Sequence, residues 1–362
     1  MNKILLILAL LFTILACSVF QAPSLPTPFP TSTVPPSPTV PPPPPLRSLA
    51  EEKGFLIGSA VSYEYLHTDS MYRDLLAREF NLLATENDLK FGPAHPEPDR
   101  FDFEGGDALV AFAQANGMAV RGHTLVWDWQ NPDWLVEGNY TRDELISILR
   151  EHIYTVVGRY RGQIAAWDVV NEALDADGNL RDTFWLRGIG PEYIPLAFQW
   201  AHEADPEAQL FYNEQAAERM NAKSDGVYAL VKGLRDRGIP IHGVGMQMHV
   251  DLNAAPPPGE VAANMARLGE LGLEVQITEM DVRIGSWILP QKLRSQAVIY
   301  QDMLKVCLEA ENCDTMVVWG ATDQYSWLPE LTGMQDAGVI FDFQYQPKPA
   351  VEALLERFEL TE

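Results

Sequence analysis

The residues best suited to chemistry in this sequence follow short apolar segments, at the places where buried strands would end. They are carboxylates, amides, imidazoles and an indole. A lone carboxylate in such a place is most often a solvated loop residue, but several at successive segment ends predict one shared site. These residues are Glu86, Asn87, His123, Asn171, Glu172, Asn213, Glu214, Gln247, His249, Glu279, Asp281 and Trp319.

The residue types narrow the reaction. The sequence has no Gly-x-Ser-x-Gly elbow and no phosphate-binding loop. His123 and His249 lack the tight spacing of a metal-binding motif, so we expect neither a metal nor a cofactor. Carboxylates combined with amides and flat aromatic faces are typical of glycoside hydrolysis, in which one carboxyl protonates the leaving oxygen and another attacks or activates water.

Alternating strand and helix patterns predict how these residues are positioned. Helices are expected near 69–80, 107–116, 142–161, 191–204, 222–237, 259–271, 290–310 and 348–358. Strands are expected at Phe55–Val61, Asn81–Asn87, Met118–Trp127, Ile164–Glu172, Gln209–Glu214, Gly243–His249, Glu274–Asp281 and Thr315–Gly320. Eight such pairs favour an α/β fold of the (β/α)8 TIM-barrel type, whose strand ends meet on one face. An open doubly wound sheet is the alternative, but its Gly-rich turn after the first strand is missing.

Helix boundaries have their own signals. Thr141 and Glu144 have the spacing of a capping box at the start of the third helix. Gly117, Gly238 and Gly272 stand where helices are expected to end.

The chain divides into three regions. Residues 1–16 have the short apolar core of a secretory signal peptide, and Cys17 after Leu15-Ala16 resembles the lipidated cysteine of a bacterial lipoprotein. A plain signal peptide with an incidental cysteine is the alternative. Residues 17–46 are rich in Pro, Ser and Thr, as in an extended linker. Residues 47–362 are expected to form one catalytic domain, held at the cell surface or secreted.

Charge and cysteine content limit the partners and the compartment. The 26 basic against 50 acidic residues give a net charge of -24, so nucleic acid is an improbable partner and we expect none. We expect no membrane contact beyond the N-terminal anchor, and a monomer by default. Export favours a disulfide between Cys307 and Cys313, whereas a reducing compartment would leave two buried thiols.

Several motifs resemble glycoside hydrolase family 10, the retaining endo-β-1,4-xylanases. The acid/base and nucleophile signatures are Trp167–Glu172 (WDVVNE) and Gln276–Asp281 (QITEMD). The other motifs are Asn81–Lys90 with Phe101–Phe103, Gly122–Trp127, Gly245–His249 and Trp319–Trp327, all in the family's order. The resemblance covers 47–362, and the spacing of Cys307 and Cys313 also resembles a family disulfide.

The resemblance implies a role for each matching residue. Glu172 would be the general acid/base and Glu279 the nucleophile, while Asn171 would bind the sugar 2-hydroxyl. His249 would orient Glu279, with Asp281 holding the imidazole. Trp319 and Trp327 would cover the sugar beside the cleaved bond and exclude a hydroxymethyl group, which favours xylose. The remaining residues implied to bind xylan or xylo-oligosaccharides are Glu86, Asn87, Lys90, His123, Trp127, Gln130 and Gln247.

Four positions depart from the family pattern. Asp128 and Trp129 replace a customary His and a small polar residue, Phe91 replaces Trp, and Met248 replaces a small residue. We expect these changes on the binding side, where they would affect preference for chain length. Two other functions are left open: a retaining β-1,4-glucanase or other β-glycosidase on the same barrel, and a lipoprotein that binds polysaccharide without cutting it.

Overall fold

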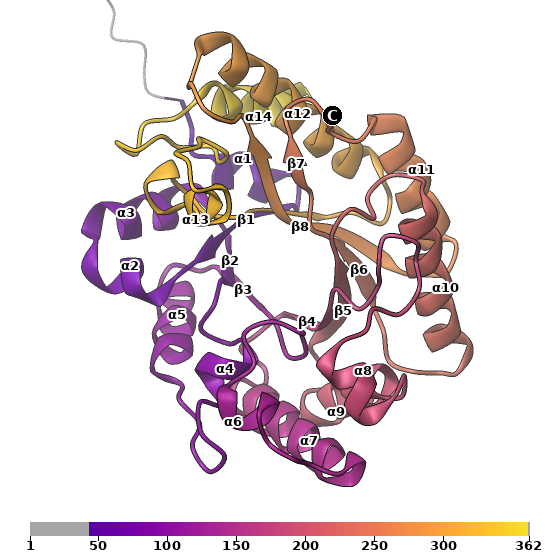
Figure 1. Cartoon of the computed structure of the whole chain (residues 1–362). Helices are drawn as coiled ribbons and strands as arrows, with labels where there is room; N and C mark the ends of the chain where they lie inside the picture. The colour runs from indigo at the N-terminus through magenta and orange to yellow at the C-terminus, as the bar shows by residue number, and fades with distance from the viewer. Residues whose placement is uncertain (1–42, 361–362) are drawn as a thin grey trace, which may run out of the picture. The chain divides into compact units, whose positions relative to one another are not determined.

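Eight parallel strands close into a barrel in the computed structural model, which describes residues 43–360 (Figure 1). The ring runs from β1 through β6, continues to β8 and β9, and returns to β1. Its strands are β1 (Leu56–Val61), β2 (Leu82–Thr85), β3 (Ala119–Gly122), β4 (Ala166–Asn171), β5 (Gln209–Glu214), β6 (Gly243–Met246), β8 (Glu274–Arg283) and β9 (Thr315–Val318). The prediction of a (β/α)8 barrel is confirmed, and the open doubly wound alternative is wrong.

One predicted strand is interrupted. The expected strand Gly243–His249 ends at Met246 as β6, and a short strand β7 (His249–Asp251) then pairs with Asp281–Arg283 of β8. The break lies at Met248, whose φ of 66° is incompatible with an extended strand. The predicted strands at Asn81–Asn87, Met118–Trp127 and Thr315–Gly320 also end earlier than expected, so their last residues lie in loops above the barrel.

All eight predicted helices are present: α3 (Ser70–Glu79), α5 (Glu104–Ala115), α7 (Arg142–Arg159), α9 (Tyr193–Ala204), α10 (Ala222–Asp236), α11 (Pro258–Gly269), α12 (Pro290–Glu309) and α14 (Pro349–Leu360). Figure 1 shows them around the outside of the barrel. The helices that the sequence did not reveal are short: α1 (Leu46–Glu52), α2 (Tyr63–Thr68), α4 (Phe91–Ala94), α6 (Asp133–Val136), α8 (Phe184–Ile189) and α13 (Leu328–Thr332). Between residues 43 and 360 no helix is long and apolar enough to cross a membrane.

The predicted helix ends are confirmed. The Thr141 side chain accepts from the amide of Glu144, and the Glu144 carboxylate accepts from the amide of Thr141 at 2.7 Å. Gly117, Gly238 and Gly272 follow α5, α10 and α11 with φ between 63° and 70°, a conformation that glycine adopts at low cost.

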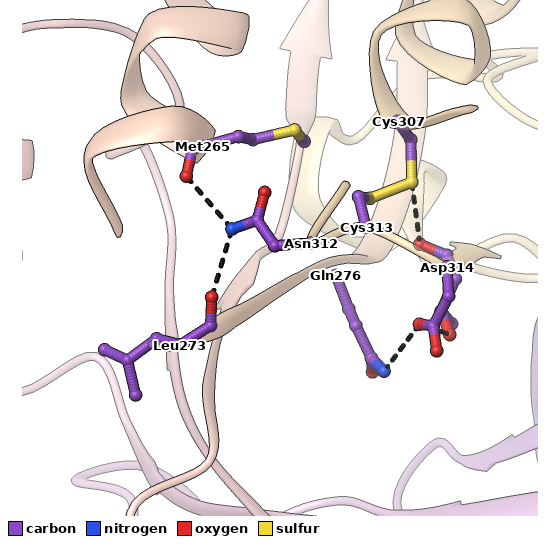
Figure 2. The surroundings of a disulfide bond; sticks show 8 residues. Met265, Leu273, Gln276, Cys307, Asn312, Cys313 and Asp314 are labelled. Atoms are coloured by element: carbon purple, nitrogen blue, oxygen red, sulfur yellow. Dashed lines mark hydrogen bonds between the residues drawn. A yellow bond between two sulfur atoms is a disulfide. The ribbon is translucent and has the colours of Figure 1, made fainter. Parts of the chain in front are cut away.

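The structure contains a disulfide between Cys307 in α12 and Cys313 before β9, with the Cα atoms 5.0 Å apart (Figure 2). The loop that it closes is tied to the rest of the barrel by Asn312, whose side-chain amide donates to the carbonyls of Met265 and Leu273 at 3.0 Å. This loop enters β9 from its amino end, so it lies at the opposite end of the barrel from the strand-end polar residues.

His152 of α7 is buried without a hydrogen bond. Its ring is fully enclosed and stacks on Phe91 with ring centroids 3.8 Å apart, near the ring of His95. Neither ring nitrogen has a partner within the described range. Burial, with a small contribution from His95, holds the pKa of His152 well below its usual 6.5.

We therefore predict a loss of stability in acid that depends on His152. Below pH 6.5 His152 is protonated in the unfolded chain but stays neutral in the folded protein. The free energy of unfolding therefore falls by up to about 1.4 kcal/mol for each pH unit of acidification. Urea unfolding of the His152→Leu variant at pH 7.5 and pH 5 should show a shallower fall than wild type. The matched control is His67→Leu, at an exposed position. A fall of the same size in all three proteins would contradict the prediction.

Candidate active site

The structure brings the predicted site residues together at the carboxyl ends of the strands. Asn171 is the last residue of β4 and Glu172 follows it, while Glu279 and Asp281 lie in the extended part of β8. Gln247 follows β6, His249 begins β7, His123 follows β3 and Trp319 follows β9. This is the face on which barrel enzymes carry their chemistry, because loops can vary there without disturbing the core.

The Glu279 carboxylate is buried and surrounded by donors. Its side chain is 6% exposed. Asn213 Nδ2 donates to Oε1 at 2.5 Å, and His249 Nε2 lies 3.1 Å from Oε2. His123 Nδ1 lies 3.7 Å from Oε1. A carboxylate with donors on both oxygens is held in one orientation and favoured in its ionised form.

His249 supplies a positive charge to this carboxylate. Its Nδ1 lies 2.8 Å from Asp281 Oδ2, so it faces one carboxylate on each ring nitrogen. Burial lowers the pKa of His249, but the charges and hydrogen bonds of Asp281 and Glu279 outweigh burial and raise it to about 10. An imidazolium donates from both nitrogens, whereas a neutral ring could donate from only one.

The pKa of Glu279 reflects these neighbours. Burial raises it, yet the charge of His123 together with the hydrogen bond and charge of His249 outweigh burial and leave it below the usual 4.5. Glu279 is therefore a carboxylate at neutral pH. The arrangement suits a nucleophile whose attack does not require removal of a proton.

A chain of amides connects Glu279 to Glu172. Asn171 Oδ1 accepts from Asn213 at 2.9 Å and from Gln247 at 3.1 Å, and Gln247 also donates to Glu172 Oε1 at 3.1 Å. Because its oxygen is occupied twice, Asn171 has only its amide nitrogen to offer a ligand. These hydrogen-bonded amides fix the orientation of both carboxyl groups.

Asn213 is a positioning residue that the sequence flagged only as polar. Its oxygen accepts from Thr278 at 2.7 Å, which directs its nitrogen toward Glu279. The neighbouring strand makes room for it at Gly245, where an added Cβ would lie 2.1 Å from Asn213 Oδ1. A glycine on a barrel strand opposite an amide is the signal that could have identified this pair.

His123 is held by a buried ion pair inside the barrel. This pair was not identified from the sequence. Asp168 of β4 accepts from Arg121 of β3, and its Oδ2 lies 3.0 Å from His123 Nδ1. Arg121 also donates to Gln276 at 2.6 Å, and both ions of the pair are 1% exposed. Charged residues in the middle of apolar strands were the available signal, because such charges are rarely buried unless paired.

Several of the residues predicted to bind sugar form a second polar group. Lys90 Nζ donates to Asn87 at 2.8 Å and lies 5.0 Å from the centre of the Trp127 ring. Asn87 donates to Glu86 at 3.3 Å, and the exposed Gln130 reaches Asn87 only at 3.5 Å. Burial raises the pKa of Glu86 to about 7, against the lowering effect of Lys90. The indole N–H of Trp127 is buried without a partner among residues 43–360.

Two tryptophans lie against the histidines. The Trp319 ring meets His123 edge to face at 5.0 Å, and the Trp327 ring is tilted against His249 at 5.0 Å. Trp327 also donates its indole N–H to Asp281 at 2.8 Å, which fixes its orientation. Trp319 is 7% exposed, so most of its ring is packed inside the protein. The ring contributes to the site both through this packing and through its edge.

The four residues that depart from the family pattern lie in different surroundings. Phe91 is packed against His152, and Met248 is fully buried. Asp128 accepts from the amide of Phe184 at 2.7 Å and so supports the start of α8. Only Trp129, at 62% exposure, presents its ring to solvent.

The fold and the paired carboxyl groups define a glycoside hydrolase built on a (β/α)8 barrel. Residues 45–357 match the profile of glycosyl hydrolase family 10, so the chain belongs to that family. It is 42% identical to endo-1,4-beta-xylanase B of Thermotoga neapolitana over 87% of this chain and 92% of that protein. It is also 42% identical to the beta-1,4-xylanase of Dictyoglomus thermophilum, over 82% of this chain and 86% of that protein.

Solved xylanase structures have the same fold as this chain. Xylanase 10B from Thermotoga maritima is 40% identical with a TM-score of 0.84, covering 87% of this chain and 98% of that one. Xylanase 10B from Thermotoga petrophila, solved in complex with xylobiose, is 41% identical with a TM-score of 0.84, covering 87% and 97%.

The environment of Glu279 predicts a pH effect of His249. Since His249 lowers the pKa of Glu279, its removal should raise that pKa and move the acid limb of the kcat/KM profile upward by about one pH unit. The His249→Asn variant should also lose about 10²-fold in kcat. Hydrolysis rates between pH 3 and 7 test this, with His67→Asn as the control. An acid limb at the same pH in His249→Asn and wild type would contradict the assignment.

Proposed function

We propose that this protein is a retaining endo-β-1,4-xylanase that cleaves internal bonds of xylan through a covalent glycosyl-enzyme intermediate. The observation that carries the proposal is the pair of buried carboxyl groups joined by one amide chain, of which Glu279 alone is held ionised by an imidazolium. Family 10 is a retaining family, and the named relatives are xylanases.

In the first step an oxygen of Glu279 attacks the anomeric carbon. The bond from that carbon to the leaving sugar breaks while the carboxyl proton of Glu172 passes to the leaving oxygen. In the second step the Glu172 carboxylate takes a proton from water, whose oxygen bonds to the anomeric carbon as the bond to Glu279 breaks. Two inversions at one carbon retain its configuration.

The remaining site residues would bind the sugars. The free amide nitrogen of Asn171 is placed to donate to the 2-hydroxyl of the sugar at the cleaved bond, a contact that strengthens in the transition state. Lys90, Asn87 and Glu86 offer donors and acceptors to the next sugar on the glycone side. Trp319 and Trp327 would leave no room for a hydroxymethyl group, which favours xylose over glucose.

Two substitutions test this mechanism. Glu279→Ala should reduce reducing-sugar release from β-1,4-xylan by on the order of 10⁴-fold, because the nucleophile is lost. Glu172→Ala should reduce kcat/KM by about 10²–10⁴-fold on substrates with poor leaving groups, and far less on 2,4-dinitrophenyl β-xylobioside, whose leaving group needs no proton. Proton NMR of the first products should show the β-anomer.

Each alternative function gives a different result in the same assay. Cleavage of a β-1,4-glucan but not of xylan would keep the mechanism and replace the substrate. Binding of xylan without release of sugar from either polymer would favour the non-catalytic lipoprotein. First products with the α-configuration would contradict the assignment of Glu279 as nucleophile.

We also propose that the enzyme is exported as a cell-surface lipoprotein and acts as a monomer. The signal sequence 1–16, Cys17 and nearly all of the linker 17–46 lie outside the described residues, so this rests on the sequence. The disulfide between Cys307 and Cys313 fits an oxidising compartment.

The anchor is tested at Cys17. In a bacterial host, the full chain should incorporate labelled palmitate and fractionate with membranes, whereas Cys17→Ala should not be labelled and should be released or remain unprocessed. Activity of the catalytic domain should be equal in both, since the anchor has no part in catalysis. Equal labelling of the two proteins, or no labelling of wild type, would contradict lipidation at this residue.

A further inference from the structure

Arg181 is a partly buried cation beside Glu172 that takes no part in the two-step mechanism above. Arg181 lies in the loop that follows β4, and its Nη1 is 3.7 Å from Glu172 Oε2. Its side chain is 27% exposed, yet its Nε and Nη2 atoms are buried and have no hydrogen-bond partner among residues 43–360. A guanidinium usually makes several hydrogen bonds when it is buried for structural reasons. Its guanidinium instead pairs with the Glu172 carboxyl group, and it also interacts electrostatically with Tyr193.

Backbone hydrogen bonds within this loop hold Arg181 near Glu172. Leu174 and Leu180 form an antiparallel bridge, and the amide of Arg181 donates to the carbonyl of Ala173 at 2.8 Å. Asp175 closes the turn between them by accepting from the amides of Asp177 and Asn179. Arg181 is thereby held opposite the residue that follows Glu172.

The same loop is anchored to the barrel at its base. The amide of Leu174 donates to buried Glu214 at 3.2 Å, and the amide of Ala173 donates to the hydroxyl of Tyr212 at 3.1 Å. Tyr212 in turn donates to Glu214 at 2.5 Å, and Lys223 pairs with Glu214 at 2.9 Å. The backbone between Glu172 and Arg181 is therefore hydrogen-bonded to the barrel at its base.

The two oxygens of Glu172 have different surroundings. Oε1 accepts from Gln247 at 3.1 Å, whereas Oε2 faces Arg181 beyond hydrogen-bond distance. Other charged groups around Glu172 come from neighbouring elements: Lys90 from the loop after β2, Glu214 from β5 and Glu279 from β8. Glu214 and Glu279 are carboxylates, whereas Lys90 and Arg181 are cations.

We propose that Arg181 is a positioning residue for the acid/base, stabilising the carboxylate that Glu172 becomes when it gives its proton to the leaving oxygen. The proton moves from Glu172 to that oxygen as the glycosidic bond breaks, and it is replaced from water in the second step, so Arg181 itself exchanges no proton. The separation of 3.7 Å leaves Oε2 free to hold the proton beforehand. The assignment rests on the proposed function.

The test compares the pH profiles of kcat/KM for two aryl β-xylobiosides. Arg181→Met removes the charge, so Glu172 should keep its proton to higher pH and the basic limb with the phenyl substrate should move up by about one pH unit. Arg181→Lys keeps the charge and should show less than half of that shift. With the 2,4-dinitrophenyl substrate, which needs no acid, the profiles should coincide.

Arg187→Met is the matched control, since Arg187 is an exposed arginine of α8 that pairs with Asp182. Its profiles should match those of wild type. Should Arg181→Met fail to fold, Arg181→Gln is the second neutral variant. A basic limb that does not move in the neutral variant, or that moves equally in Arg181→Lys or Arg187→Met, overturns the assignment alone. A wild-type protein that cleaves neither xylan nor the aryl xylobiosides overturns the proposed function together with this assignment.

Discussion

The active site depends on keeping the buried Glu279 carboxylate ionised within a few hydrogen bonds of a second buried carboxyl group, that of Glu172. Burial alone would push Glu279 toward its neutral form. His249, charged because it lies between Glu279 and Asp281, reverses that tendency. Glu172 has different neighbours. Hydrogen-bonded side-chain amides connect the Glu172 and Glu279 carboxyl groups and hold them in position relative to each other.

The barrel makes this arrangement possible because most of its strands contribute residues at or just after their carboxyl ends. Glu279 and His249 come from β8 and β7, and the amides come from β4, β5 and the end of β6. Below them, the Arg121–Asp168 pair fixes His123 from inside the barrel. Such a site tolerates little movement, since a shift of one strand would break contacts made by several others.

The sequence predicted the barrel, the strand ends and the main helices because apolar periodicity and helix caps are local signals. It could not show that β6 ends before Met248, because no local signal marks a methionine for the positive φ that it has there. The contacts of Asn213, Arg121 and Asp168 also depend on closure of the barrel, which joins residues more than forty positions apart in the chain. The motifs predicted which residues lie at the strand ends, but not partners such as Arg181, because nothing in the chain order places Arg181 beside Glu172.

The central claim, that Glu279 is the nucleophile, is tested most directly by trapping the intermediate. A 2-deoxy-2-fluoro-β-xylobioside with a 2,4-dinitrophenyl leaving group should inactivate the enzyme and add one xylobiosyl unit to its mass. Peptide mass spectrometry should find that unit on Glu279. An adduct on Glu172 or on another residue, or turnover of the fluorosugar with inversion and no adduct, would contradict the account.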